Sequence, residues 1–327
     1  MFNSKYRRKF QVIFIRNTSM TEITAAMVKE LRETTSAGML DCKKALMETN
    51  GDMEQAVDWL RKKGLASAAK KASRIAAEGL VSVAVDGSKG AVVEVNSETD
   101  FVAKNEIFQE YVEDAAKVAL MSNGDVEKMK AFNCPKCGKT FGERLTDMIA
   151  KIGENMNLRR AQVLSVSNGI VSSYIHNAAR PNVGKIGVLV ALESNADKTK
   201  LAELGKHIAM HVAASAPIAL TIAEVPAESL EREKAIYAEQ ARASGKPENI
   251  IEKMIEGRVR KYYDEVVLEE QAYIMDPDKK IKQVVAEAAK EFGTDVKLAG
   301  YVCFKLGEGL QKREEDFAAE VAAQLSK

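Results

Sequence analysis

The stretch GAVVEVNSETD, residues 90–100, decides the fold because a related stretch, GVLVALESNAD, occupies residues 187–197. Each is preceded by a similar tetrapeptide, GLVS at 79–82 and GIVS at 169–172. In each copy β-branched runs predict a hairpin, and a loop and a helical pattern follow. An internal repeat of this kind predicts an α+β fold with a duplicated core, in which two related subdomains have approximate symmetry.

The two copies differ at one informative position. Asp100-Phe101 in the first copy corresponds to Asp197-Lys198 in the second, so one place in the fold accepts a ring or an ammonium group. A position that tolerates lysine is normally exposed. Phe101 is therefore a candidate exposed aromatic between a strand and a helix, which is typical of an interface anchor. The alternative is that Phe101 belongs to the core of its own copy.

Residues 21–64 predict a module of three short helices. Thr24 is suited to begin the first, residues 39–49 form the second, and Asp52 with Gln55 has capping-box spacing for the third. A module this small buries little apolar surface in its own core, so we expect it to be stabilised by packing against a partner or a neighbouring domain. Its cations form either a docking face or an ordinary solvated surface: Lys29, Arg32, Lys43 and Lys44. An Ala/Lys-rich segment, 65–77, is expected to link this module to the first hairpin.

The second half adds a helical insertion to the repeat. Residues 227–267 carry apolar residues at helical spacing, and Ser244-Gly-Lys-Pro247 divides them into two arms of an antiparallel hairpin. Strand-like segments at 271–275 and 301–306 flank an expected helix at 278–292. Residues 311–325, with Phe317, predict a last amphipathic helix.

Composition excludes several classes of protein. The 327 residues include 48 Lys+Arg against 47 Asp+Glu, which leaves no cation surplus for a simple nucleic-acid binder. Residues 1–19 are basic and free of acid, which indicates either an upstream extension before a true start at Met20 or, more faintly, a transit peptide. The longest clean apolar run, 186–192, is far too short to span a membrane. Four cysteines form no disulfide framework at this length, so a reducing compartment is expected.

Two groups of residues have metal-ligand spacing. His207 and His211 stand at i and i+4 of a helix, and Cys134-Pro-Lys-Cys137 is half of a zinc knuckle. The histidines also fit as core or capping residues, and the cysteines fit as an inert surface loop or as a structural metal site shared across a dimer. No phosphate-binding loop G-x-x-x-x-G-K-[ST] and no G-x-G-x-x-G occurs, so direct nucleotide binding is not expected.

From Met20 onward the chain resembles the bacterial elongation factor Ts family in seven collinear stretches. They are ITAAMVKELRETTSAGMLDCKKAL (23–46), NGDMEQAVDWLRKKG (50–64), VNSETDFVAKNE (95–106), KIGENMNLRR (151–160), KHIAMHVAAS (206–215), SGKPENIIEKMIEGR (244–258) and DFAAEVAAQ (316–324). The resemblance implies a ubiquitin-associated-like three-helix module, the duplicated core, an inserted antiparallel coiled coil and a C-terminal helix. The implied domains are an extension at 1–19, the module and linker at 20–74, core subdomain 1 at 75–169, core subdomain 2 at 170–219 and 269–303, the coiled coil at 220–268, and a C-terminal module at 304–327.

The same resemblance implies guanine-nucleotide exchange on elongation factor Tu, without catalysis of a chemical step and without a cofactor. In the family an Asp-Phe pair enters the partner's GTPase domain and disturbs its Mg²⁺ site; the matching residues are Asp100 and Phe101, flanked by Thr99 and Val102. The other implied partner contacts are Lys29, Arg32, Met39, Leu40, Lys43 and Lys71 near the N-terminus, Ile152, His176, Ile274 and Met275 in the core, and Phe317 near the C-terminus.

The resemblance further implies a cytoplasmic protein that binds GDP-bound and nucleotide-free elongation factor Tu, without contacting nucleic acid or membrane. Family members occur as dimers and as one-to-one complexes, so the oligomeric state stays open, with a homodimer or heterotetramer through the core or coiled coil among the alternatives. Residues 177–185 lengthen a turn of the family pattern beside His176, and residues 1–19 and the Cys134–Cys137 loop have no counterpart in that pattern. Two rival functions remain: a metal-dependent enzyme that uses Cys134, Cys137, His207 and His211, and a passive scaffold.

Overall fold

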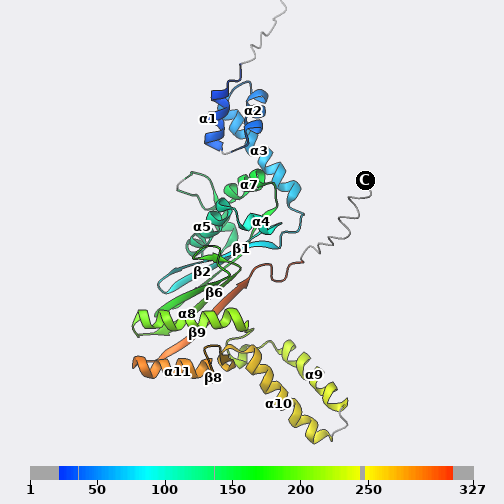
Figure 1. Ribbon diagram of the computed structural model, residues 1–327, viewed down its shortest axis with the longest axis vertical. Helices are drawn as coiled ribbons and strands as arrows, with labels where there is room; N and C mark the ends of the chain where they lie inside the picture. Colours follow the sequence, from blue (N-terminus) through cyan, green and yellow to red (C-terminus); the bar gives the residue numbers. More distant parts are fainter. Residues whose placement is uncertain (1–21, 36, 136, 244–246, 312–327) are drawn as a thin grey trace, which may run out of the picture. The chain divides into compact units, whose positions relative to one another are not determined.

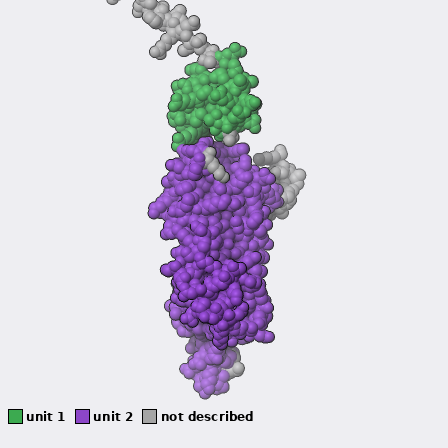
Figure 2. Space-filling view, turned by 90° about the vertical axis from the view of Figure 1, so that its left-hand side faces the viewer, with its two compact units in different colours: residues 1–66 green, residues 67–327 purple. Residues whose placement is uncertain are grey.

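The computed structural model describes residues 22–35, 37–135, 137–243 and 247–311. The chain forms two compact units, residues 1–66 and 67–327, which are coloured separately in Figure 2. Each unit is described by itself. The predicted C-terminal helix, and with it Phe317, lies outside the described residues.

The first unit is built from short helices around a small apolar core. Its helices are α1 (Ala25–Thr35), α2 (Met39–Glu48) and α3 (Met53–Lys71), and the division between the units falls inside α3. Leu31, Cys42 and Leu46 are fully buried and form the centre of this core. The expected link at 65–77 is helical as far as Lys71, because alanine and lysine are strong helix formers and no proline or β-branched residue interrupts them.

The second unit begins with a four-stranded antiparallel sheet in the order β3-β2-β1-β5. Its strands are β1 (Glu78–Asp86), β2 (Lys89–Ser97), β3 (Met156–Ser165) and β5 (Val183–Gly184). The predicted hairpin is confirmed, with Asp86 paired to Lys89 and Gly87 at a positive φ of 57° in the turn. Helices α4 (Asp100–Ala103), α5 (Glu106–Ser122), α6 (Val126–Ala131) and α7 (Phe141–Ile152) gather on this part of the unit (Figure 1). Phe108, Tyr111 and Phe141 are buried in the core between these helices and the sheet.

A second antiparallel sheet has the order β4-β6-β9. It consists of β4 (Gly169–His176), β6 (Ile186–Ser194) and β9 (Val296–Lys305), and helices α8 (Lys198–Ser215) and α11 (Ile281–Phe292) pack against it. The prediction of a helix from residue 278 was wrong by three residues. Asp276–Lys280 is instead strand β8, which pairs with β7 (Ala272–Tyr273), so α11 begins only at Ile281.

The two sheets share an apolar interface that explains their continuous apolar runs. In β1, Leu80 faces the helices, whereas Val81 and Val83 face the other sheet. Leu189 and Phe304 meet them from β6 and β9. Strands that are buried on both faces read as unbroken apolar sequence instead of alternating with polar residues.

Two glycines recur at corresponding places in the repeat. Gly79 has φ of 126° and Gly169 has φ of 141°, a region that side chains other than glycine rarely adopt. A Cβ atom would stand 2.2 Å from the carbonyl oxygen of Val95 in the first case and 1.9 Å from that of Leu192 in the second. Glycine is therefore required at the start of both hairpins.

Helices α9 (Ala227–Ala243) and α10 (Glu248–Val266) run side by side and extend away from the second sheet (Figure 1). Arg242 and Glu248 form an ion pair of 3.6 Å across the interruption, and the Arg258 guanidinium lies 5.9 Å from the Tyr237 ring centre.

Within the described ranges, no helix combines the length and apolar character needed to cross a membrane.

Candidate functional site

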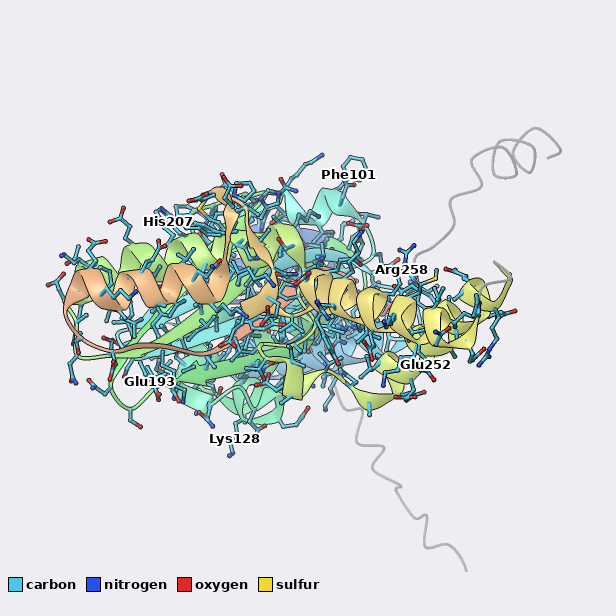
Figure 3. The ribbon with its side chains drawn as sticks, turned by 90° about the horizontal axis from the view of Figure 1, so that it is seen from below. Phe101, Lys128, Glu193, His207, Glu252 and Arg258 are labelled. Carbon is cyan, nitrogen blue, oxygen red and sulfur yellow. The ribbon has the colours of Figure 1, made fainter. Side chains whose placement is uncertain are left out.

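Phe101 is the most conspicuous apolar side chain on the second unit. It is 74% exposed and projects beyond the ribbon (Figure 3). It lies in the one-turn helix α4, where the next two residues, Val102 and Ala103, are buried in the core. Lys104 places its ammonium 5.3 Å from the Phe101 ring centre and 3.7 Å from a carboxylate oxygen of Asp100. The predicted exposure of Phe101 is confirmed, and the alternative that the ring is core is wrong.

The corresponding place in the second copy has a different local structure. Asp197 accepts hydrogen bonds from the backbone N–H groups of Thr199 and Lys200 and begins α8 directly. Lys198 is exposed, as the comparison of the copies predicted. The first copy instead separates its one-turn helix α4 from the long helix α5, which Asn105 caps. This extra turn is what presents Phe101 outside the core.

The two residues that precede α4 are hydrogen-bonded to distant parts of the chain. The Thr99 backbone N–H and hydroxyl donate to the two carboxylate oxygens of Glu154, at 2.9 and 2.7 Å. The neighbouring Glu98 accepts from the backbone N–H of Asn155 and from Arg74. No local sequence signal predicts these contacts, because Thr99 and Glu154 are 55 residues apart.

In the first unit, α2 presents apolar residues outward. Met39 is 52% exposed and Leu40 is 83% exposed, whereas Cys42 and Leu46 on the other face of α2 are buried. The predicted cations Lys29, Arg32 and Lys43 are exposed, and Lys29 forms an i,i+4 ion pair with Glu33. Lys71 is half-buried in the second unit, where its ammonium donates to the Ser67 hydroxyl.

The turn between β7 and β8 presents two further predicted residues. Ile274 and Met275 are 42% and 47% exposed. The backbone N–H of Ile274 donates to Nδ1 of His211, whose Nε2 shares a 2.9 Å hydrogen bond with Gln271. Burial lowers the pKa of His211, although the hydrogen bond to Gln271 opposes this. A neutral imidazole therefore supports the turn from inside the core.

The two remaining predicted partner contacts of the core, Ile152 and His176, lie at the ends of a helix and a strand. Ile152, at the end of α7, is half-buried against the first core. His176, at the end of β4, is exposed, and its Nδ1 lies 3.2 Å from the Tyr174 hydroxyl. The lengthened turn 177–185 that follows it supplies β5, which pairs with β1 of the first sheet.

The hypothesis of a metal site receives no support. His211 is buried and uses both ring nitrogens in hydrogen bonds, so it is a core histidine. Cys134 and Cys137 lie together in a turn where the Gly138 N–H donates to the Cys134 carbonyl, and an Arg144 nitrogen lies 3.8 Å from the Cys134 sulfur. Among the described residues, no three His, Cys, Asp or Glu side chains are grouped so as to hold a metal ion.

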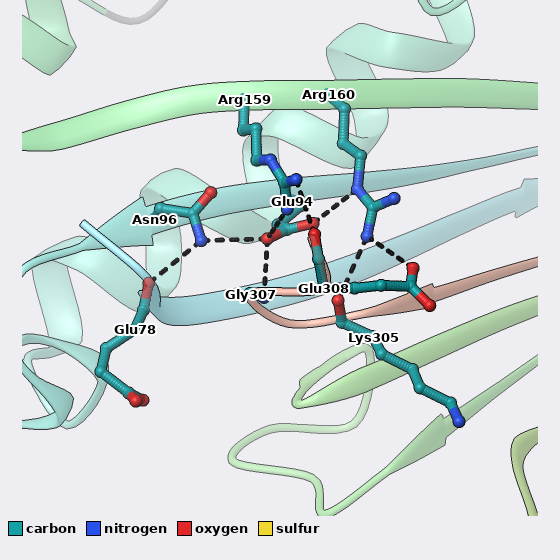
Figure 4. A network of polar contacts seen from close by, with 8 residues as sticks. All are labelled: Glu78, Glu94, Asn96, Arg159, Arg160, Lys305, Gly307 and Glu308. Atoms are coloured by element: carbon teal, nitrogen blue, oxygen red, sulfur yellow. Dashed lines mark hydrogen bonds and ion pairs between the residues drawn. The ribbon is translucent and has the colours of Figure 1, made fainter. Parts of the chain in front are cut away.

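Sequence reasoning also missed a buried polar network around Glu94 (Figure 4). Its fully buried carboxylate accepts from Arg160 Nε at 2.6 Å and from Arg159, Asn96 and the Gly307 backbone N–H, each at 2.9 Å. Burial raises the pKa of Glu94, but these four hydrogen bonds together outweigh burial and lower it. The two arginines also donate to the carbonyls of Lys305 and Glu308. The network thus fixes the path of the chain after β9.

The fold and the site define an α+β protein that presents apolar residues on its surface from short, well-supported turns. A family model described as Elongation factor TS matches residues 98–308. Elongation factor Ts of Rhodospirillum centenum is 61% identical over 93% of this chain and 99% of that protein, and that of Rhodospirillum rubrum is 59% identical over 94% and 100%. Elongation factor Ts of Rhizobium etli is 57% identical over 93% of this chain and 99% of that protein. The chain belongs to the elongation factor Ts family, and it is therefore a bacterial translation elongation factor.

Proposed function

We propose that this chain binds elongation factor Tu and promotes the release of its GDP, with Asp100 and Phe101 entering the GTPase domain and disturbing the Mg²⁺ and phosphate site. The protein carries out no chemical step in this scheme and needs no cofactor of its own. It is a cytoplasmic factor that binds GDP-bound and nucleotide-free partner alike. Membership of the elongation factor Ts family supports the identity of the partner.

The exposure of Phe101 is the single observation that carries the proposal. A phenylalanine that is 74% exposed costs free energy in the isolated protein and regains it when a partner covers it. Burying one such ring contributes about 1.5–3 kcal/mol. Since Val102 and Ala103 anchor α4 in the core, the ring is presented without an opening of the fold.

Phe101 is not sufficient alone. Lowering the affinity of elongation factor Tu for GDP by about 10⁴-fold requires about 5.5 kcal/mol of differential interaction, which is more than the burial of one ring provides. The exposed Met39 and Leu40, together with Lys29, Arg32 and Lys43, are the second contact region of the proposal. Lys71, in the second unit, is a further proposed contact. Ile152, His176, Ile274 and Met275 are the third. By thermodynamic linkage, the factor by which this chain lowers the affinity of elongation factor Tu for GDP equals the factor by which GDP lowers its affinity for this chain.

The finer architecture is part of the same proposal. We take the core as duplicated, because Gly79 and Gly169 have matching conformations at matching places in the repeat. The domain boundaries given above, the ubiquitin-associated-like character of the first unit, the coiled-coil arm and an assembly into homodimers or heterotetramers belong to it as well.

Release of a fluorescent GDP analogue from elongation factor Tu tests the proposal. Addition of this chain is expected to raise the release rate in a concentration-dependent way that saturates. A chain that binds the partner and leaves the release rate unchanged would instead be a passive scaffold, and the proposal would be abandoned.

A further inference from the structure

The helix that presents Phe101 is too short to be stable without outside support. α4 has four residues, and a single helical turn fixes several backbone torsions for very few hydrogen bonds. Its buried residues, Val102 and Ala103, fix its position in the core. Burial of these two residues does not supply hydrogen-bond partners for the backbone groups at the two ends of α4. Those partners hold the short helix, and with it the Phe101 side chain, in one orientation.

At the N-terminal end, Glu154 does what a capping-box residue normally does. In α7 the box is local: the Thr140 N–H donates to Glu143, three residues later, and the Glu143 N–H donates back to the Thr140 hydroxyl. In α4 the corresponding third position is Val102, which is apolar and buried. Glu154 supplies the missing carboxylate from the turn after α7 and takes both the N–H and the hydroxyl of Thr99.

At the C-terminal end, Gln109 has the matching role. Its side-chain N–H donates to the Ala103 carbonyl at 2.8 Å, which satisfies an acceptor left open where α4 ends. The Gln109 carbonyl oxygen in turn accepts from Arg180 Nε at 2.8 Å, and this bond fixes the orientation of the amide. Arg180 belongs to the lengthened turn 177–185 that follows His176, so the second half of the unit reaches the end of α4.

We propose that Glu154 and Gln109 are positioning residues for Phe101, which hold the two ends of α4 so that the ring is presented in the orientation that nucleotide release requires. This rests on the proposed function for its consequence, but the geometry stands without it. Removing hydrogen bonds to a charged carboxylate is expected to slow stimulated GDP release about tenfold in Glu154→Ala. Glu154→Gln retains one acceptor oxygen and is expected to fall between the wild type and Glu154→Ala.

Three further variants sharpen the assignment. Gln109→Glu keeps an oxygen for Arg180 but loses the donor to Ala103, so it is expected to slow release as Gln109→Ala does. Asp197→Ala is the matched control, because it removes two carboxylate-to-backbone hydrogen bonds at the corresponding strand-to-helix junction of the second copy. It is expected to leave the release rate unchanged.

A double-mutant cycle with Phe101→Ala separates positioning from general stability. If Glu154 acts through Phe101, then Glu154→Ala changes the rate by less than about twofold when Phe101 is already absent. Effects that multiply in the double variant overturn the proposal. So does a Glu154→Ala protein that stimulates GDP release from elongation factor Tu at the wild-type rate.

Amide hydrogen exchange gives a readout that needs no partner. The Thr99 N–H is expected to lose protection in Glu154→Ala, with the loss confined to residues 99–104, and to keep it in Asp197→Ala. Unchanged protection at Thr99 overturns the positioning role whatever the release assay gives. If the wild type fails to accelerate release, the proposed function falls, and a confined loss of protection still supports the positioning of Phe101.

Discussion

Gly187 lies so close to Val81 that an added Cβ atom would stand 2.7 Å from Cγ1 of Val81, and Gly90 has the same relationship with Val171, at 2.6 Å. The four residues occupy matching places in the two copies of the repeat. Where the two sheets meet, the glycine of each copy therefore packs directly against the valine of the other copy. Close packing at this interface leaves no room for a methyl group on either side.

Gly187→Ala is therefore expected to destabilise the protein by about 1–3 kcal/mol, the usual cost of overpacking a filled core. Urea denaturation followed by circular dichroism measures the change. Gly257→Ala is the matched control: it lies exposed within α10 with nothing within 4 Å of an added Cβ, and alanine there is expected to stabilise the helix by about 0.5–1 kcal/mol. Equal effects of both substitutions would contradict the packing account.

Glu94→Gln is expected to destabilise the protein by about 2–3 kcal/mol at neutral pH, because hydrogen bonds to a buried charge are lost. The folded protein holds the pKa of Glu94 below its ordinary value of 4.5, so its contribution is complete above 4.5 and disappears as the pH falls through the folded-state pKa. The stability difference between wild type and variant should shrink accordingly in acid. Glu308→Gln, whose side chain is 53% exposed, should cost less than about 1 kcal/mol.

His211 predicts a second acid-sensitive element. Since its pKa is lowered in the folded protein, the unfolded chain binds a proton first, and stability falls as the pH drops below 6.5. Protonation of Nδ1 also breaks the hydrogen bond from the Ile274 N–H. An NMR titration, with the His211 signal assigned through its loss in His211→Asn, is expected to give a pKa below 6.5, with the Ile274 amide shifting in parallel. A midpoint above 6.5 would contradict the buried, neutral assignment.

Leu40→Ala is expected to slow stimulated GDP release by about tenfold or less without lowering the melting temperature, because the side chain is 83% exposed and buries its apolar surface only against a partner. Leu65→Ala is the control, since Leu65 is 54% exposed in the same unit and is not among the proposed contacts. A loss of stability in Leu40→Ala, or an equal effect of Leu65→Ala on release, would remove Leu40 from the proposed contact region.

The sequence predicted what depends on periodicity and missed what depends on distant partners. The first hairpin, the three N-terminal helices and the exposure of Phe101 follow from turn residues, apolar spacing and the comparison with Lys198. The separate helix α4 was not predicted, because one turn is too short to show a helical period. Its support by Glu154 and Gln109 had no local signature either. The helical prediction for residues 278–280 is wrong because their pairing with β7 depends on a tight turn that the sequence pattern does not reveal.

The central claim is that Phe101 drives nucleotide release, and stopped-flow release of a fluorescent GDP analogue from elongation factor Tu tests it most directly. Phe101→Ala is expected to slow stimulated release by about one to two decades, in line with the lost burial of one ring, and to leave some stimulation through the other contacts. Because the ring is 74% exposed, the stability of the isolated protein should not fall. A Phe101→Ala protein that stimulates GDP release from elongation factor Tu at the wild-type rate would contradict the account.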